Sequence, residues 1–133
     1  MLVLIGALPY LAFALDGGPP WLMRWFRFQC HGRPERTLTL AGRLFPVCSR
    51  CLGIYTGLAL AGALAWPLLS RNARRAWLAF GALAMVSEVA LQDGTHHAPF
   101  HALRLLTGLM LAWPVALILL AEITPPERDR SAP

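Results

Sequence analysis

Long apolar segments separated by short arginine-rich stretches are the feature that most limits how this 133-residue chain can fold. Hydrophobic residues make up 56% of the chain and charged residues 14%, whereas soluble domains average about 45–50% and about 25%. Intrinsic disorder is excluded because charged residues are too sparse. The pattern predicts an all-α fold: an integral membrane bundle of about four transmembrane helices with a cysteine-containing interfacial loop, in a multi-pass protein of the cell membrane.

Four apolar segments supply the predicted helices, and they belong to one membrane domain, residues 1–121. The expected helices cover about 1–15, 52–69, 76–92 and 99–121, and the cysteine loop covers 28–51. Residues 71–75 then form a short basic loop, and the Pro- and charge-rich residues 122–133 form a disordered tail. Gly53 and Gly57 make a G-x-x-x-G motif, which lets membrane helices pack closely and offers a face for a homo-oligomer.

Residues 1–15 allow two interpretations. As a helix they rise about 22 Å, which is short of the roughly 30 Å hydrocarbon core, so a short transmembrane helix bent near Pro9 is one of them. The other is a signal peptide that ends at Ala12-Phe13-Ala14, although no basic region precedes the apolar run.

Two shorter segments carry local structural signals. Trp21 and Trp25 alternate with Arg24 and Arg27 after Pro20, which suits a first helical position. This pattern predicts an amphipathic helix at the membrane interface, with an aromatic-rich loop as the alternative. Further on, residues 37–40 and 43–45 flank Ala41-Gly42, and a small β-hairpin is expected there.

Basic charge is carried entirely by arginine, with twelve arginines, no lysine and a net charge of +5. These arginines lie between the apolar segments, which is typical of membrane-flanking charge, so membrane lipids are the expected partners. Nucleic-acid binding is not expected because no basic helix or aromatic platform is present. The positive-inside rule favours a cytoplasmic position for the cysteine loop without deciding it.

Three cysteines and a histidine form the strongest motif of the chain. Cys48-Ser49-Arg50-Cys51 is a C-x-x-C, and Cys30 with His31 lies on the other arm of the predicted hairpin. Three sulfurs and one imidazole are the set that tetrahedral Zn²⁺ prefers, and nearby arginines favour the thiolates that a metal needs. Adjacent residues rarely both face one ion, so the fourth ligand could come instead from the next loop on that side. The candidates there are Asp93, His96 and His97.

Other chemistries are open to these thiols. Cys48 and Cys51 could form a thiol–disulfide couple, although the βαβ context of thioredoxin-like proteins is missing. The three cysteines could also be free structural thiols or iron–sulfur ligands, although a cluster normally takes four cysteines.

A second polar group follows the third apolar segment, at residues 92–97 and His101. His97 and His101 have the spacing of a two-histidine site on a helix, but Pro99 interrupts it, and a solvated polar loop is the simpler interpretation. In a metal-dependent membrane enzyme acting on an anionic lipid-like or small substrate, Asp93 or His97 would be the catalytic base.

Ionisable residues inside apolar helices are costly and are usually paired or functional. Glu88 is such an intramembrane residue, and an ion pair of Arg104 with Glu88 or Asp93 is the structural interpretation. The functional alternative is an anion-binding site, because guanidinium groups bind phosphate or carboxylate in bidentate fashion. Its residues would be Arg33, Arg36, Arg50 and Arg104.

The order of these residues resembles the small prokaryotic membrane proteins grouped as domain-of-unknown-function family 2085. The similar segments are Cys30-His31-x-x-Pro34-x-Arg36, Phe45-Pro46-Val47-Cys48-x-Arg50-Cys51-x-Gly53-Ile54-Tyr55, Asp93-Gly94 and Arg104-x-x-Thr107-Gly108. The resemblance covers about residues 25–115 and implies a multi-helix protein of the prokaryotic plasma membrane, without an assigned activity. Gly32 and Thr37 stand where the family commonly has glutamine and serine, and Ala102-Leu103 replaces a frequent Ser-Asn. These differences alter side-chain hydrogen bonding near the site and leave the cysteines in place.

Overall fold

The computed structural model describes residues 1–65, 69–95 and 100–123, without the side chains of Asp93 and Thr95. In these ranges the chain forms five α-helices, one short 3₁₀ helix and one two-stranded hairpin, which confirms the all-α class. The elements are α1 (Leu2–Ala14), α2 (Pro20–Gln29), η1 (Pro34–Arg36), β1 (Thr39–Leu40), β2 (Arg43–Leu44), α3 (Ser49–Leu64), α4 (Arg71–Thr95) and α5 (His101–Ile123).

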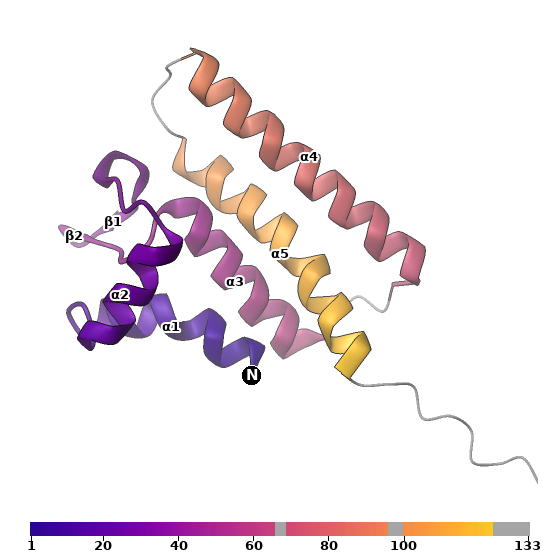
Figure 1. The fold of residues 1–133 in the computed structure, drawn as a ribbon, viewed down its shortest axis with the longest axis horizontal. Helices are drawn as coiled ribbons and strands as arrows, with labels where there is room; N and C mark the ends of the chain where they lie inside the picture. The colour runs from indigo at the N-terminus through magenta and orange to yellow at the C-terminus, as the bar shows by residue number, and fades with distance from the viewer. Residues whose placement is uncertain (66–68, 96–99, 124–133) are drawn as a thin grey trace, which may run out of the picture.

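Four of the helices lie side by side in the order α4, α5, α3, α1 (Figure 1). The helix α2 and the β1–β2 hairpin lie on the left of these four helices in Figure 1, near the start of α3. This arrangement brings the chain between α2 and α3 next to the first turns of α3 and α5, where the predicted site residues lie.

Glycines set the close approach of α3 to its neighbours. A Cβ atom at Gly53 would overlap the carbonyl oxygen of Leu105 on α5, and one at Gly108 would overlap the carbonyl oxygen of Arg50 on α3. The close packing that the G-x-x-x-G motif predicts is therefore made within the chain. The residues of α5 cover Gly53 and Gly57, and a homo-oligomer through this face stays a prediction.

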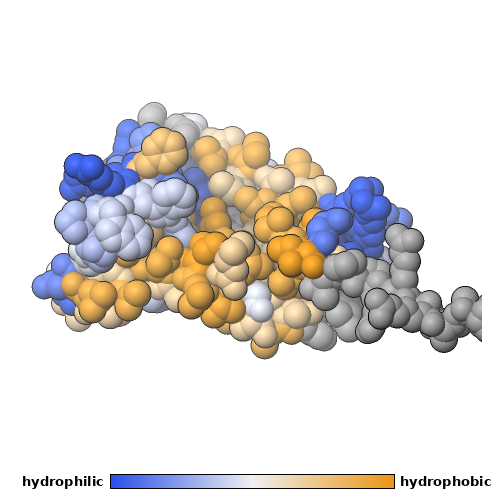
Figure 2. Space-filling view, turned by 60° about the horizontal axis from the view of Figure 1, so that its bottom comes forward, coloured by the Kyte–Doolittle hydropathy of each residue, from blue (hydrophilic) through white to orange (hydrophobic). Residues whose placement is uncertain are grey.

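Among the described helices, only α5 is both long and apolar enough to cross a bilayer. The sequence predicts about four spans, but α1 has 13 residues and α3 has 16, and α4 carries arginines at its start and Glu88 within it. Apolar side chains nevertheless cover much of the surface, and Figure 2 shows a broad hydrophobic band between hydrophilic groups at either end.

The helix boundaries differ from those predicted where charge or cysteine interrupts the apolar pattern. The basic residues 71–75 form the first turns of α4, because arginine is a good helix former and the Ser70 Oγ accepts a hydrogen bond from the Ala73 N–H at 3.3 Å. The helix α3 begins at Ser49, so Cys51 is helical, and it ends at Leu64 before the left-handed Ala65. Glu122 belongs to α5 and not to the tail.

The two local predictions before α3 are confirmed. Residues 20–29 form the amphipathic helix, with Pro20 in its first turn. The hairpin pairs Thr39 with Leu44 and Leu40 with Arg43 across the turn at 41–42.

Three predicted features lie outside the described residues. They are the end of the second predicted helix at 66–68, the polar loop with His96 and His97, and the tail from residue 124.

Replacing Gly53 with alanine is expected to destabilise the fold by about 1–3 kcal/mol, because the added methyl group collides with the α5 backbone. Gly94→Ala is the matched control, because Gly94 is also helical and has nothing within 4 Å of an added Cβ. Thermal unfolding in detergent measures both variants. Equal melting temperatures for the two would contradict the close α3–α5 contact.

Candidate metal centre

Three cysteine sulfurs meet where the end of α2 approaches the start of α3. The Sγ atoms of Cys30, Cys48 and Cys51 all lie within 4.8 Å of one another. In a tetrahedral zinc site the Zn–S bonds of about 2.3 Å place the sulfurs about 3.8 Å apart, so small adjustments would let all three bind one ion. All three thiols are free.

The local structure explains how Cys30 turns toward the other two. Cys30 ends α2, and its extended backbone leads the chain out of the helix while its N–H still bonds to the Phe26 carbonyl at 2.8 Å. Gly32 follows with a φ of 57°, a left-handed conformation that glycine adopts without strain. The chain therefore reverses directly after the cysteine, and Cys30 is 7% exposed.

The C-x-x-C motif lies at the N-terminus of α3. Cys48 is the N-cap and Cys51 is in the first turn, so both point from the same helix end. The exposed N–H groups and the dipole of a helix N-terminus stabilise negative charge, and thiols placed there ionise more easily. Both cysteines of the motif therefore lie at the positive end of the α3 helix dipole.

Hydrogen bonds also favour the thiolate of Cys30. Hydrogen bonds from the Cys48 and Cys51 thiols lower the pKa of the Cys30 thiol most strongly, burial partly opposes this, and the backbone N–H groups of Cys48 and Gly32 lower it further. The Cys48 N–H lies 3.2 Å from the Cys30 Sγ. Backbone donors to a ligand sulfur of this kind orient and stabilise metal-bound thiolates.

Packing between α2 and α3 holds the two arms together. The rings of Phe26 and Tyr55 meet edge to face at 6.0 Å, and the Tyr55 hydroxyl donates to the Gln29 Oε1 at 2.6 Å. Val47, directly before the C-x-x-C, is 1% exposed. The convergence of the cysteines therefore rests on a buried core as well as on the local turn.

The predicted histidines occupy different places. His31 is exposed and lines the cavity at the cysteines, but it is not part of the group whose ligand atoms lie within 4.8 Å of one another. The Nδ1 of His101 lies 3.3 Å from the Ser49 Oγ. His97 and the side chain of Asp93, the candidate catalytic bases, lie outside the described part of the chain.

A buried ionic network lies beside the cysteines. Glu88 and Arg104 each have side chains that are 3% exposed, and the Arg104 Nε lies 3.4 Å from the Glu88 Oε1, so the predicted ion pair is present. Arg50, from the C-x-x-C itself, forms a second ion pair with Glu88. Gln92 accepts a hydrogen bond from the Arg104 Nε at 2.7 Å.

Sequence reasoning missed two members of this network. The sequence predicts Glu88 or Asp93 as the partner of Arg104, but it indicates Arg50 only as an anion-binding candidate and Gln92 only as part of the polar group at 92–97. Arg50 and Glu88 are separated by 38 positions in the sequence, so no local signal indicates their pairing. Gln92 lies four residues after Glu88 on α4, and this helical spacing could have indicated it.

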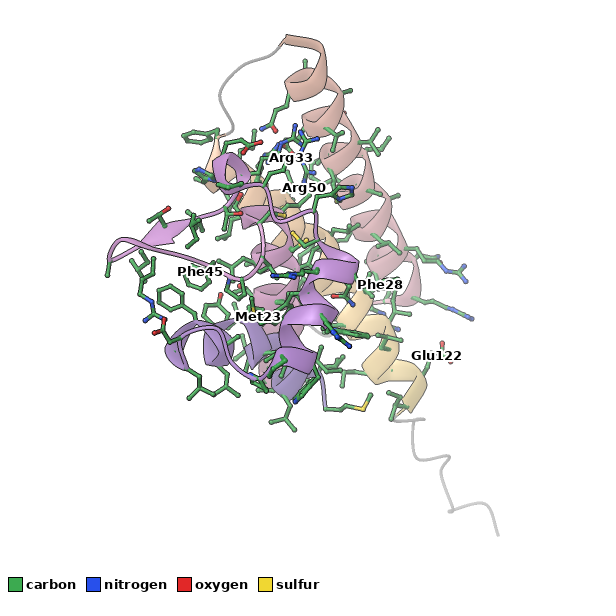
Figure 3. The ribbon with its side chains drawn as sticks, turned by 60° about the vertical axis from the view of Figure 1, so that its left-hand side comes forward. Met23, Phe28, Arg33, Phe45, Arg50 and Glu122 are labelled. Atoms are coloured by element: carbon green, nitrogen blue, oxygen red, sulfur yellow. The ribbon has the colours of Figure 1, made fainter. Side chains whose placement is uncertain are left out.

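The cysteines and the network share one cavity of about 460 Å³. All four arginines that the sequence suggested for anion binding line it, and Figure 3 shows Arg33 and Arg50 close together at the end of the molecule away from Glu122. The lining residues are Gln29, Cys30, His31, Gly32, Arg33, Arg36, Cys48, Arg50, Cys51, Ile54, Met85 and Arg104.

The residues that build this site lie in the part of the chain that matches a known family model. Residues 30–118 match the family described as "Predicted membrane protein (DUF2085)". The chain belongs to this family. The match begins at Cys30 and takes in the whole C-x-x-C, Glu88 and Arg104.

Relatives occur in methanogenic archaea. An uncharacterised protein of Methanocaldococcus jannaschii is 26% identical over 84% of this chain and 78% of its own length. An uncharacterised protein of Methanothermobacter thermautotrophicus is 62% identical over 32 residues, which are 24% of this chain and 29% of that relative. No solved structure matches the chain.

Glu88→Gln is expected to lower the free energy of unfolding by about 3–5 kcal/mol, because it leaves two largely buried guanidinium groups without their carboxylate. The control is Asp16→Asn, which removes the carboxylate of the exposed Asp16–Arg43 pair and should cost at most about 1 kcal/mol. Denaturant or thermal unfolding in detergent compares them. A Glu88→Gln variant as stable as the control would contradict the buried network.

Proposed function

We propose that the protein is a multi-pass membrane protein that holds one Zn²⁺ ion at the membrane interface through Cys30, Cys48 and Cys51. The observation that carries the proposal is the grouping of three sulfurs from two separate segments of the chain. A metal ion would join the end of α2 to the start of α3 and stabilise a loop that has little core of its own.

A third cysteine beside the C-x-x-C motif supports a metal site over a redox couple. A C-x-x-C couple needs two sulfurs, whereas here a third sulfur also lies within 4.8 Å of both. The helix N-terminus and the Cys48 N–H that donates to the Cys30 Sγ are compatible with metal-bound thiolates. An iron–sulfur cluster is less well matched, because the chain has three cysteines and such clusters normally take four.

Two ligands suit the fourth coordination position. One is the imidazole of His31, which follows Cys30 and lines the same cavity. The other is a water or an anionic ligand from the cavity. A site with three protein ligands and one exchangeable position is typical of catalytic zinc, and in that case the protein would act as a metal-dependent membrane enzyme.

Exposed apolar residues support insertion of the row of helices into the bilayer. On α4, Phe80, Leu83 and Val86 are 60–67% exposed although they are large and apolar. The amphipathic α2 would then lie at the interface, with Trp21 and Trp25 exposed at head-group depth. The family description supports this membrane placement.

Zinc content of the detergent-purified protein tests the proposed metal site. Wild-type protein should contain about one zinc ion per chain, and Cys48→Ser should lose most of it, because two thiolates bind zinc far more weakly than three. His101→Ala is the control, since His101 is a potential ligand that contacts Ser49 and not the sulfurs. Full zinc content in Cys48→Ser, or no zinc in the wild type, would refute the metal site.

A further inference from the structure

The cavity beside the cysteines carries more positive than negative charge. Arg33, Arg50 and Arg104 line it, and guanidinium groups remain charged at any physiological pH. Glu88 is the carboxylate that pairs with Arg50 and Arg104, so it balances one of their two charges. Arg36 lines the cavity as well. Even with a zinc ion and three thiolates, which together carry one negative charge, the lining remains net positive.

Arg50 keeps one hydrogen-bond donor that no described residue uses. The Arg50 Nε is buried and has no hydrogen-bond partner among the described residues. A buried unpaired donor costs free energy, and an acceptor supplied by a ligand would remove that cost. Oxygens of a phosphate group suit such donors, because guanidinium groups bind phosphate in bidentate fashion.

An apolar pocket of about 390 Å³ adjoins the charged cavity. Met85 on α4 lines both. The other residues of the apolar pocket come from α4 and, in the case of Leu111, from α5. They are Ala82, Val86, Val89, Ala90 and Leu111. The two neighbouring pockets together thus offer a polar, positively charged end and a purely apolar end.

We infer that the two pockets bind one membrane lipid with a phosphate monoester headgroup, the phosphate among Arg33, Arg50 and Arg104 and an acyl chain along α4 beside Met85. Each pocket lies in the size range of about 300–1,000 Å³ that is usual for small-molecule sites. A free phosphate ion would use the charged cavity alone and would leave the adjoining apolar pocket without an occupant.

This inference deepens the proposed function and rests on its membrane placement, but it does not need the metal. The phosphate would lie beside the sulfur cluster, because the same cavity is lined by Cys30, Cys48 and Cys51. The lipid phosphate is therefore also a candidate for the anionic ligand at the fourth zinc position.

Native mass spectrometry of the full chain in detergent, titrated with dioleoyl phosphatidic acid or dioleoyl phosphatidylcholine, tests the inference. Phosphatidic acid should bind more tightly, and Arg33→Gln should weaken it about tenfold, the loss expected for one charge-assisted contact. Arg33 is exposed, so the variant should fold. Arg24→Gln is the matched control, since Arg24 is an exposed arginine of α2 outside the cavity.

A second pair of variants tests the acyl-chain pocket. Val86→Asn should weaken phosphatidic acid binding, whereas Leu83→Asn should not, because Leu83 is equally exposed on α4 but does not line the pocket. Inorganic phosphate serves as the competitor. Equal binding of the two lipids, or a phosphate ion that displaces the lipid while Val86→Asn has no effect, would overturn the inference.

Measurements on the same samples separate this inference from the proposed function. Zinc content should be unchanged in Arg33→Gln and Val86→Asn, so loss of lipid binding with zinc retained concerns the lipid site alone. Recovery of the chain from the soluble fraction without detergent would instead contradict the membrane placement.

Discussion

The convergence of three sulfurs at the junction of α2 and α3 is the constraint on which the rest of the site depends. Cys30 is separated from the C-x-x-C by a turn, a 3₁₀ helix and a hairpin, so its approach has to be held by packing elsewhere. The contact of Phe26 on α2 with Tyr55 on α3 supplies part of that packing. On another face of α3, glycines allow close packing against α5. A metal ion at the sulfurs would join elements that the core already brings together.

A second feature of the site is the buried charge of Glu88 and Arg104 beside the sulfurs. Removing Glu88 and Arg104 from water is unfavourable, and their pairing with Arg50 and Gln92 offsets this cost. Of the described residues, four arginines line the cavity and no carboxylate does, so its lining carries net positive charge. The clustered sulfurs and the guanidinium groups of the cavity are adjacent because Arg50 lies between the two cysteines of the C-x-x-C motif.

Features set by neighbouring residues, such as turns and helix starts, could be predicted from the sequence. The cysteine spacing, the turn at Ala41-Gly42 and the position of Pro20 indicated the sulfur cluster, the hairpin and α2. Contacts between distant segments are harder to predict. The pairing of Arg50 with Glu88, for example, is not indicated by the residues around either one. The prediction of about four spans rested on the lengths of the apolar segments. The helices do not follow those segments, because α4 begins with the basic residues from Arg71 and α1 and α3 have only 13 and 16 residues.

X-ray absorption at the zinc edge of the purified protein tests the central claim most directly, because it counts the atoms bound to the metal. The account predicts about three sulfur neighbours near 2.3 Å and one nitrogen or oxygen neighbour near 2.0–2.1 Å. A zinc ion with one sulfur neighbour or none would contradict it, since Cys30, Cys48 and Cys51 would then not share an ion.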